Sequence, residues 1–341
     1  MTRRGSLRWL IALLAILTLA LAACEDDAAD DDVIDDTDEE VDDADDDADD
    51  EGEEEADAEA SDVTVGLSIS TLANPFFVTL QDGAEAAADD SGIELLVADA
   101  QDSAQTEADN IQDFITQEVD VIVINPVDSD AAVAAVESAN DAGIPVVTVD
   151  RGVEGGDVAT HIASDNVLGG ELAGEFLFEQ IGGEGVVAQM EGVPGTSAAR
   201  DRGEGFENAL DAAEGVELGT SVSANFDRDE GFSVAQDILQ SVDDLAGIFA
   251  QNDEMALGAV EAADGAGTLD DLTIVGFDAT DDALDAISDG RMDATIAQLP
   301  ALMGELGVEQ AVAIANGEDV DEELPVDVEL VTADNVDEFM E

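Results

Sequence analysis

From Val63 onward, the chain alternates short apolar runs rich in β-branched residues with longer stretches rich in Ala, Glu and Asp. The apolar runs have the length of strands, and the stretches between them have the length of helices. Near-continuous Val and Ile runs separated by helices predict parallel sheets that are covered on both faces. We predict strands at 63–70, 93–99, 119–125, 144–150, 159–163, 185–190, 216–223, 245–251, 272–278, 293–298 and 326–332.

The alternating pattern occupies residues 63–341, which is more than one compact sheet holds, so we predict two doubly wound α/β domains. In such sheets ligands bind at the carboxyl ends of the strands. Polar side chains fall at those ends here, and the residues concerned are Asn74, Asp150, Arg151, Asn252, Asp278 and Gln298. A binding site at this edge is therefore expected.

The residue types at these strand ends suit a polyol ligand. Carboxylates, amides and guanidinium groups supply the donors and acceptors that hydroxyls require. A sugar ring also needs flat apolar surfaces, and the chain has no Tyr and a single Trp, Trp9, near its start. The candidates are therefore Phe76, Phe77 and Phe226. Each has a structural alternative, since Phe pairs pack in cores and Asn or Gln at strand ends can cap helices or turns.

Residues 1–23 read as an export signal, with three Arg before an apolar run from Trp9 to Ala20 and small residues at the end. The sequence Leu-Ala-Ala-Cys at 21–24 resembles a bacterial lipobox, in which the cysteine is lipidated. The alternative is that Cys24 is only a small residue near a cleavage site. Lipidation would hold the product outside the cytoplasmic membrane, in a periplasm or at the cell surface.

Residues 24–62 are predicted to form a solvated tether. Asp and Glu fill 25 of the 38 positions from 25 to 62, so the segment buries too little apolar area to offset chain entropy. A calcium-binding role is the alternative, but the full spaced ligand pattern of a calcium loop is missing from this stretch.

The charge balance excludes several classes of partner. The chain has 87 acidic and 8 basic residues, a net charge of −79, which excludes nucleic acid. Loss of residues 1–23 removes three Arg and leaves 5 minus 87, or −82. We interpret this as the acidic surface of a halophilic protein, because molar salt screens such repulsion. With one Cys and one His, no metal site, cofactor or enzymatic activity is expected.

Blocks along the whole pattern resemble the ribose-binding proteins of bacterial sugar importers, a group of the type I periplasmic binding protein family. The resemblance covers residues 63–332 and rests on the segments STLANPFFVTLQDGAEAAAD, INPVDSDA, HIASDNVLGGELAG, GTSAARDRGEGF, FAQNDEMALGA, VGFDAT and ATIAQLP. It implies two doubly wound lobes joined by a three-crossing hinge. The implied boundaries are 63–164 plus 299–327 for the N-terminal lobe and 165–298 plus 328–341 for the C-terminal lobe.

The resemblance also implies roles for individual residues. Asn74 would bind a sugar hydroxyl, while Phe76 and Phe77 would cover one ring face and Phe226 the other. Asp150 and Arg151 would bind hydroxyls from the N-terminal lobe. The opposite edge of the sugar would be held by Arg202, Asn252, Asp278 and Gln298.

The remaining basic residues receive structural interpretations. Arg200 is expected to support Arg202 or to pair with a nearby acid, and Arg228 and Arg291 are interpreted as surface charges. His161 lies in an apolar strand and is expected to be a structural residue and not a ligand.

The function implied is capture of a monosaccharide, most directly D-ribose, by closure of the lobes, and its delivery to the membrane permease of an ABC importer. Allose, other pentoses and a furanosyl signal remain open, as does an additional chemoreceptor partner. The alternative is a sensor of the same fold that signals without transport. The chain is expected to be a monomer.

Overall fold

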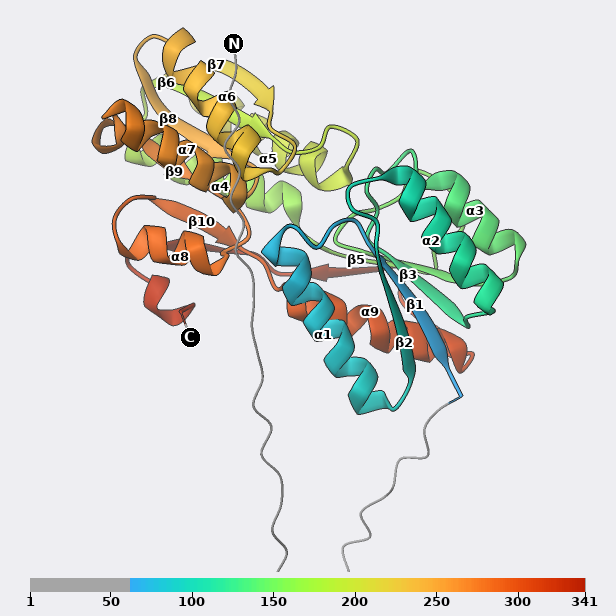
Figure 1. Cartoon of the computed structure of the whole chain (residues 1–341). Helices are drawn as coiled ribbons and strands as arrows, with labels where there is room; N and C mark the ends of the chain where they lie inside the picture. The colour runs from blue at the N-terminus through green and yellow to red at the C-terminus, as the bar shows by residue number, and fades with distance from the viewer. Residues whose placement is uncertain (1–61, 341) are drawn as a thin grey trace, which may run out of the picture. The chain divides into compact units, whose positions relative to one another are not determined.

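The computed structural model describes residues 62–340, which form two α/β lobes, each built on a six-stranded sheet (Figure 1). The predicted export signal at 1–23, the lipidation at Cys24 and the acidic tether up to residue 61 lie outside the described residues. Across 62–340, no helix combines the length and the apolar character that a membrane span requires.

We call the sheet ordered β11-β5-β4-β3-β1-β2, with its helices, the first lobe. Every strand pair in it is parallel, as the apolar runs predict. Helices α1 and α9 cover one face, and α2 and α3 cover the other (Figure 1). Its elements are β1 (Thr64–Ile69), α1 (Pro75–Ser91), β2 (Glu94–Asp99), α2 (Ala104–Gln117), β3 (Val121–Ile124), α3 (Val133–Asp141), β4 (Val146–Val149), β5 (Thr160–Ser164), α9 (Pro300–Ala315) and β11 (Glu323–Val326).

We call the sheet ordered β12-β10-β9-β8-β6-β7, with its helices, the second lobe. Strands β6 to β10 take the same relative order as β1 to β5, so the two lobes repeat one topology. Helices α4 and α5 pack together, as do α6 and α7. Its elements are α4 (Asn166–Gln180), β6 (Gly185–Glu191), α5 (Ser197–Ala212), β7 (Val216–Ser223), α6 (Arg228–Ser241), β8 (Leu245–Ala250), α7 (Asp253–Ala266), η1 (Leu269–Asp271), β9 (Thr273–Val275), α8 (Asp281–Ser288), β10 (Ala294–Ala297), β12 (Glu329–Thr332) and η2 (Val336–Glu338).

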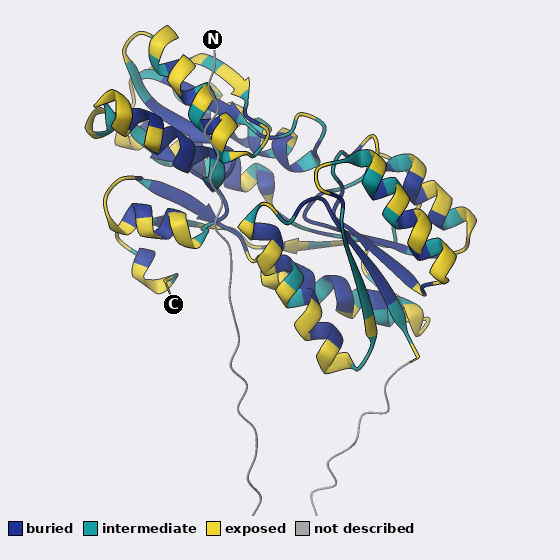
Figure 2. Ribbon diagram, viewed as in Figure 1, coloured by how far each residue is buried: buried dark blue, intermediate teal, exposed yellow. Residues whose placement is uncertain are grey.

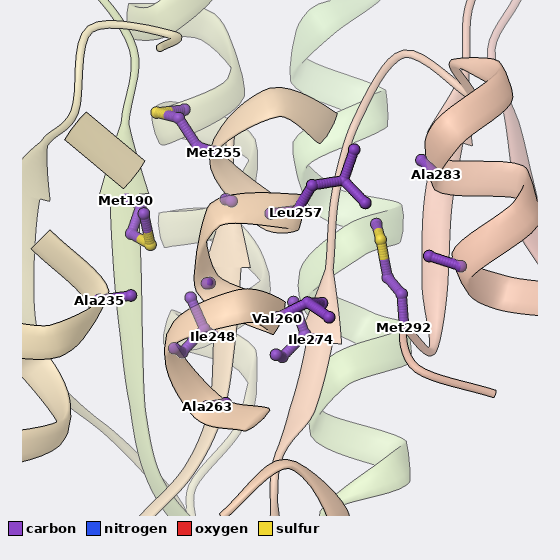
Figure 3. Close-up of a cluster of buried hydrophobic side chains, with 14 of the residues drawn as sticks. Met190, Ala235, Ile248, Met255, Leu257, Val260, Ala263, Ile274, Ala283 and Met292 are labelled. Atoms are coloured by element: carbon purple, nitrogen blue, oxygen red, sulfur yellow. The ribbon is translucent and has the colours of Figure 1, made fainter. Parts of the chain in front are cut away.

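Apolar side chains fill the space between each sheet and its helices. The central strands are buried, whereas the helices expose one side to solvent (Figure 2). In the second lobe, Ile248 and Ile274 from the sheet pack with Met255 and Val260 from α7 (Figure 3). Burial of these apolar side chains fixes the positions of the strands. The polar side chains of the expected site lie at the carboxyl ends of those strands.

The prediction of one strand over 326–332 is wrong. The segment forms two short strands in different sheets: β11 pairs with β5, and β12 pairs with β10. Between them, residues 327 and 328 carry the chain from one lobe to the other. Because β12 enters the second sheet from that side, it runs antiparallel to β10, so this sheet is not purely parallel.

The chain passes between the lobes at three places. After β5 it enters α4, after β10 it enters α9, and after β11 it enters β12. Each lobe has its own sheet, and the two lobes are joined by these three crossings, an arrangement that permits hinge motion.

Candidate functional site

A pocket lies where strand ends and helix starts of the two lobes face each other. The space between its lining residues, counted together with the part open to solvent, is about 240 Å³. The first lobe contributes residues that follow β1 and β4. The second lobe contributes residues from helix α5, which follows β6, and from the segments directly after β7, β8 and β9. The lining residues are Asn74, Phe76, Phe77, Asp150, Arg151, Ala198, Arg202, Phe226, Asn252 and Asp278. Gln298, the remaining predicted site residue, donates from Nε2 to Asp278 Oδ1 at 2.6 Å.

The start of α1 presents Asn74 and the Phe pair. Asn74 caps the helix, and its Oδ1 accepts from the Phe76 backbone N–H at 2.9 Å. The cap uses the amide oxygen and leaves Nδ2 as a donor for a ligand. Phe76 and Phe77 are buried and meet edge to face, with ring centroids 5.2 Å apart.

Asp150 and Arg151 form the polar part of the first-lobe wall. Asp150 Oδ2 accepts from Asn125 Nδ2 at 3.1 Å and lies 3.6 Å from Arg151 Nε. Arg151 Nη1 donates to the carbonyl of Pro126 at 3.1 Å, and the guanidinium lies 5.0 Å from the centre of the Phe77 ring. The Arg151 Nε atom has no hydrogen-bond partner among residues 62–340, which leaves it able to bind a ligand acceptor.

Glu107 on α2 holds the loop that supplies the Pro126 carbonyl. Glu107 is 1% exposed, and its Oε2 accepts from the Val127 backbone N–H at 2.7 Å. Burial raises the pKa of Glu107 to about 7, although the Val127 hydrogen bond and the positive charge of Arg151 both oppose the rise.

The raised pKa of Glu107 makes a pH dependence of stability predictable. The folded chain binds this proton more tightly than the unfolded chain, so the contribution of Glu107 is complete below pH 4.5 and is lost as the pH rises toward 7. The free energy of unfolding of E107Q relative to the unsubstituted chain should therefore rise by about 2–3 kcal/mol between pH 4.5 and 8. Denaturant unfolding of both proteins at constant salt measures this difference, and a pH-independent difference would refute the assignment.

Arg202 and Asp278 form the polar part of the second-lobe wall. Arg202 is 3% exposed, its Nε donates to Asn166 Oδ1 at 2.8 Å and its Nη1 donates to the Gln251 carbonyl at 2.6 Å. The guanidinium stacks 3.8 Å from the centre of the Phe277 ring and lies 3.6 Å from Asp278 Oδ1. These contacts fix the plane of the guanidinium beside the pocket.

Phe226 supplies the aromatic surface of the second lobe. The Arg151 and Arg202 Cζ atoms lie 5.5 Å and 5.8 Å from its ring centre. The ring rests against Gly192, where a Cβ would come within 2.0 Å of it, so only glycine permits this packing. Asn252 caps α7 through Oδ1 and donates from Nδ2 to the Phe226 carbonyl at 3.2 Å, which joins two pocket residues.

Three of the predicted site residues have left-handed backbone conformations. The φ angles are 62° at Asp150, 61° at Phe226 and 124° at Asp278. Such angles cost about 1–3 kcal/mol each in residues other than glycine and tend to occur at functional sites. The sequence gives no sign of this, because Gly or Asn is the usual residue at a left-handed position.

The pocket is electrically balanced although the chain is strongly acidic. Arg151 faces Asp150 and Arg202 faces Asp278. Burial lowers the pKa of both arginines, whereas the neighbouring aspartates oppose that change. Burial raises the pKa of Asp278, and Arg202 opposes the rise. Two cations and two acids in one small pocket favour an uncharged ligand that both donates and accepts hydrogen bonds.

Sequence reasoning missed Ala198 and the residues that support the wall. Ala198 lines the pocket from α5. Asn125, Asn166 and Gln251 hold the charged residues and lie behind them. All three follow strands, so their position at the carboxyl edge was the available signal.

The other singled-out residues lie outside the pocket wall. His161 Nδ1 shares a hydrogen bond with Thr148 Oγ1 at 2.8 Å, and His161 is not among the lining residues. Arg200 pairs with Glu154, as one of its two interpretations predicts. Arg228 is more than a free surface charge, since it pairs with Glu254 at 2.9 Å and Asp282 at 2.8 Å.

Comparison with known proteins identifies the family. A family model described as a periplasmic binding protein domain matches residues 65–319. The chain belongs to the periplasmic binding protein family. The ribose import binding protein RbsB of Haemophilus influenzae is 48% identical over 269 residues, which are 79% of this chain and 91% of that protein. The protein of the same name from Bacillus subtilis is 45% identical over 80% of this chain and 88% of its own length.

Solved structures agree with the family assignment. An ABC transporter solute-binding protein from Bacillus halodurans with bound myo-inositol is 36% identical, with a TM-score of 0.78 over 82% of this chain and 98% of that chain. The predicted fold class, two doubly wound lobes of the type I periplasmic binding protein fold, is therefore confirmed.

Family membership also bears on activity and location. Periplasmic binding proteins carry substrates and are not enzymes, which confirms the prediction that this chain is not an enzyme. Its homologues in the family are extracytoplasmic, in agreement with the coarse location predicted from the export signal.

Proposed function

We propose that the chain is the sugar-binding receptor of an ABC importer and that its ligand is a monosaccharide, D-ribose before any other. The observation that carries this proposal is the balanced, buried pocket in which two Arg–Asp pairs and two amides lie beside three phenyl rings. A sugar offers hydroxyls that match the polar groups and C–H faces that match the rings.

Ribose is favoured by the names of the relatives. Proteins named for ribose import reach 45–49% identity, whereas a D-ribose/D-allose-binding protein from Pseudomonas aeruginosa reaches 34%. Because these relatives are named for import, they favour a receptor that serves transport over one that only signals. We propose Asn74, Phe76, Phe77, Asp150 and Arg151 as ligand contacts from the first lobe. The proposed contacts from the second lobe are Arg202, Phe226, Asn252, Asp278 and Gln298, whose Oε1 has no hydrogen-bond partner within 62–340.

Binding proceeds by closure of the lobes on the sugar. Each lobe carries about half of the polar groups, so neither alone surrounds a ligand. A sugar that contacts both lobes stabilises the closed form by the free energy of the added contacts. The permease then recognises the closed, loaded protein. A chemoreceptor would be an additional partner that reads the same form, and the receptor acts as a monomer.

Direct bonds between the lobes also contribute to closure. The Ser129 backbone N–H donates to the Gly195 carbonyl at 2.9 Å, and the Ser197 N–H donates to Ser129 Oγ at 3.1 Å. The Gly152 N–H donates to Ser197 Oγ at 2.9 Å, and Arg200 pairs with Glu154. None of these six residues lines the sugar pocket.

Removing the Ser197 hydroxyl is expected to weaken every sugar equally. S197A should lower affinity by about fivefold, because one closed-state hydrogen bond is lost without any change at the sugar. Calorimetric titration with one pentose and one hexose tests this, and the ratio of the two affinities should be the same in S197A as in the unsubstituted chain. S241A, which removes an exposed hydroxyl bonded to Asp237 O on α6, is the control. A changed ratio would place Ser197 in the binding site.

We further propose that Cys24 is lipidated and that residues 24–62 tether the receptor outside the cytoplasmic membrane. Metabolic labelling with a fatty acid and a C24A variant test this anchor: the label should appear on the unsubstituted chain and be absent from C24A. We also propose that the acidic composition is an adaptation to a saline environment, in which salt screens the repulsion between carboxylates.

The proposed ligand is tested by calorimetric titration of the exported chain with pentoses and hexoses in molar salt. Ribose should bind most tightly, with dissociation constants for the other sugars at least about tenfold higher. Calorimetry is preferred because the chain after residue 23 has no Trp or Tyr to report binding by fluorescence. Absence of binding by every sugar would contradict the proposal.

A further inference from the structure

Asp253 is a buried acid that the ligand contacts described above do not use. It begins α7 directly after the pocket residue Asn252, is 0% exposed and does not line the pocket. The Asp253 carboxylate accepts three hydrogen bonds, all from neutral donors. These are Thr295 Oγ1 at 2.7 Å, the Thr280 backbone N–H at 2.8 Å and Thr280 Oγ1 at 3.2 Å. An ionised carboxylate without a cation partner is costly to bury, and burial raises the pKa of Asp253 to about 7.

The donors to Asp253 belong to the turn that carries Asp278. This turn has two consecutive non-glycine residues with positive φ, 124° at Asp278 and 57° at Ala279. Such a backbone persists only where its surroundings hold it. The surroundings here are β10 and Asp253.

Three successive backbone N–H groups fix the turn. Asp278 N donates to the Ile296 carbonyl at 2.8 Å, Ala279 N donates to Thr295 Oγ1 at 3.3 Å, and Thr280 N donates to Asp253 Oδ2. A hydroxyl has one hydrogen, and Thr295 gives it to Asp253 Oδ1. The lone pairs of Thr295 Oγ1 therefore remain available to Ala279. Through these two threonines, Asp253 holds both residues that follow Asp278.

The backbone directly before Asp278 also contacts Asp253. The Asp253 N–H donates to the Phe277 carbonyl at 2.8 Å. A Cβ at Gly276 would come within 2.3 Å of Asp253 Oδ1, so the approach of the carboxylate requires glycine at that position.

We propose that Asp253 is a positioning residue for the sugar site: its buried carboxylate holds the strained turn at 278–280 and thereby aims the Asp278 carboxylate into the pocket. This inference rests on the proposed function. Asp278 in turn meets Gln298 at 2.6 Å and Arg202 at 3.6 Å, so a displaced turn would disturb the second-lobe wall.

Two substitutions remove the support without touching the pocket. In D253N, the uncharged amide keeps one oxygen for the Thr280 N–H and turns its NH2 toward Thr295, whose hydroxyl must then accept where it now donates, so the charge-assisted contacts are weakened and rearranged. T295V removes the hydroxyl that joins Asp253 to Ala279, and T295S retains it. We expect D253N and T295V to weaken ribose binding by about tenfold or more. T295S, which keeps the hydroxyl, should bind ribose as tightly as the unsubstituted chain.

The matched control is Asp293, which also lies in the second lobe at the other end of β10. Its Oδ2 accepts from the Ile274 backbone N–H at 2.7 Å, and burial raises the pKa of Asp293 as it does for Asp253. D293N removes comparable backbone support and should change the melting temperature without changing ribose affinity by more than about twofold.

A double-mutant cycle separates positioning from general stability. If Asp253 acts through Asp278, adding D253N to D278N should cause little further loss of ribose affinity, whereas adding it to N74A in the other lobe should cause the full loss. Calorimetric titration in molar salt measures all variants, and circular dichroism confirms that each is folded. If D253N does not fold, the comparison of T295V with T295S decides.

Ribose binding by D253N and T295V within about twofold of the unsubstituted chain would overturn the inference and leave the proposed function intact. Full additivity of D253N with D278N would overturn it as well. An unsubstituted chain that binds no sugar would overturn both.

Discussion

R202Q is expected to weaken ribose binding by about 100- to 1000-fold. Arg202 is 3% exposed, and loss of its guanidinium leaves Asp278 buried without its cation. It also leaves Asn166 Oδ1 and the Gln251 carbonyl without a donor. Truncating one member of a buried, hydrogen-bonded charge pair typically costs 2–5 kcal/mol, or about this range of affinity. Calorimetric titration with ribose in molar salt measures the loss.

The matched control for R202Q is R291Q, which removes the same charge from an exposed position outside the pocket. It should bind ribose within about twofold of the unsubstituted chain, because the screened surface charge contributes little. Equal losses in the two variants would show a general charge effect. Unchanged affinity in R202Q would remove Arg202 from the site.

The melting temperature of the chain is expected to rise by about 10 °C or more between dilute buffer and 1 M KCl. Residues 63–341 contain 62 acids and five Arg, and the ion pairs within 62–340 engage five of those acids. The other carboxylates repel one another, and 1 M salt shortens the screening length to about 3 Å. Relief of a few kcal/mol of repulsion corresponds to this shift for a chain of this size.

Thermal unfolding followed by circular dichroism measures the salt effect. The control is a variant with E305Q and E309Q, two exposed acids on one helix, which should depend less steeply on salt because it carries less charge. A cooperative transition in dilute buffer that added salt does not raise would contradict the interpretation of the acidic surface as an adaptation to salt.

The alternation of apolar runs and helical stretches was sufficient to predict two doubly wound sheets. Burial on both faces gives continuous runs of apolar, β-branched residues, which are visible in β3 and β4, Val121–Ile124 and Val146–Val149. It was not sufficient at 326–332, where two strands of different sheets follow each other with residues 327 and 328 between them. Adjacent short strands give one apolar run, so the crossing is invisible to a pattern that reads only hydrophobicity.

The candidate site was predictable because polar residues at the carboxyl ends of parallel strands converge. Asp150, Asn252 and Asp278 follow strands far apart in sequence and line one pocket. The geometry within the site was not predictable. The positive φ angles of Asp150 and Phe226 and the support of the Asp278 turn by Asp253 depend on contacts between distant segments, which residue types alone do not encode.

The most direct measurement is a crystal structure of the chain, without residues 1–23, bound to ribose. The sugar should occupy the pocket between the Phe76–Phe77 pair and Phe226. Asp150 and Arg151 should bind it from the first lobe, and Arg202 and Asp278 from the second. Ribose bound to one lobe only, or at a place that these residues do not reach, would contradict the proposed mechanism of capture.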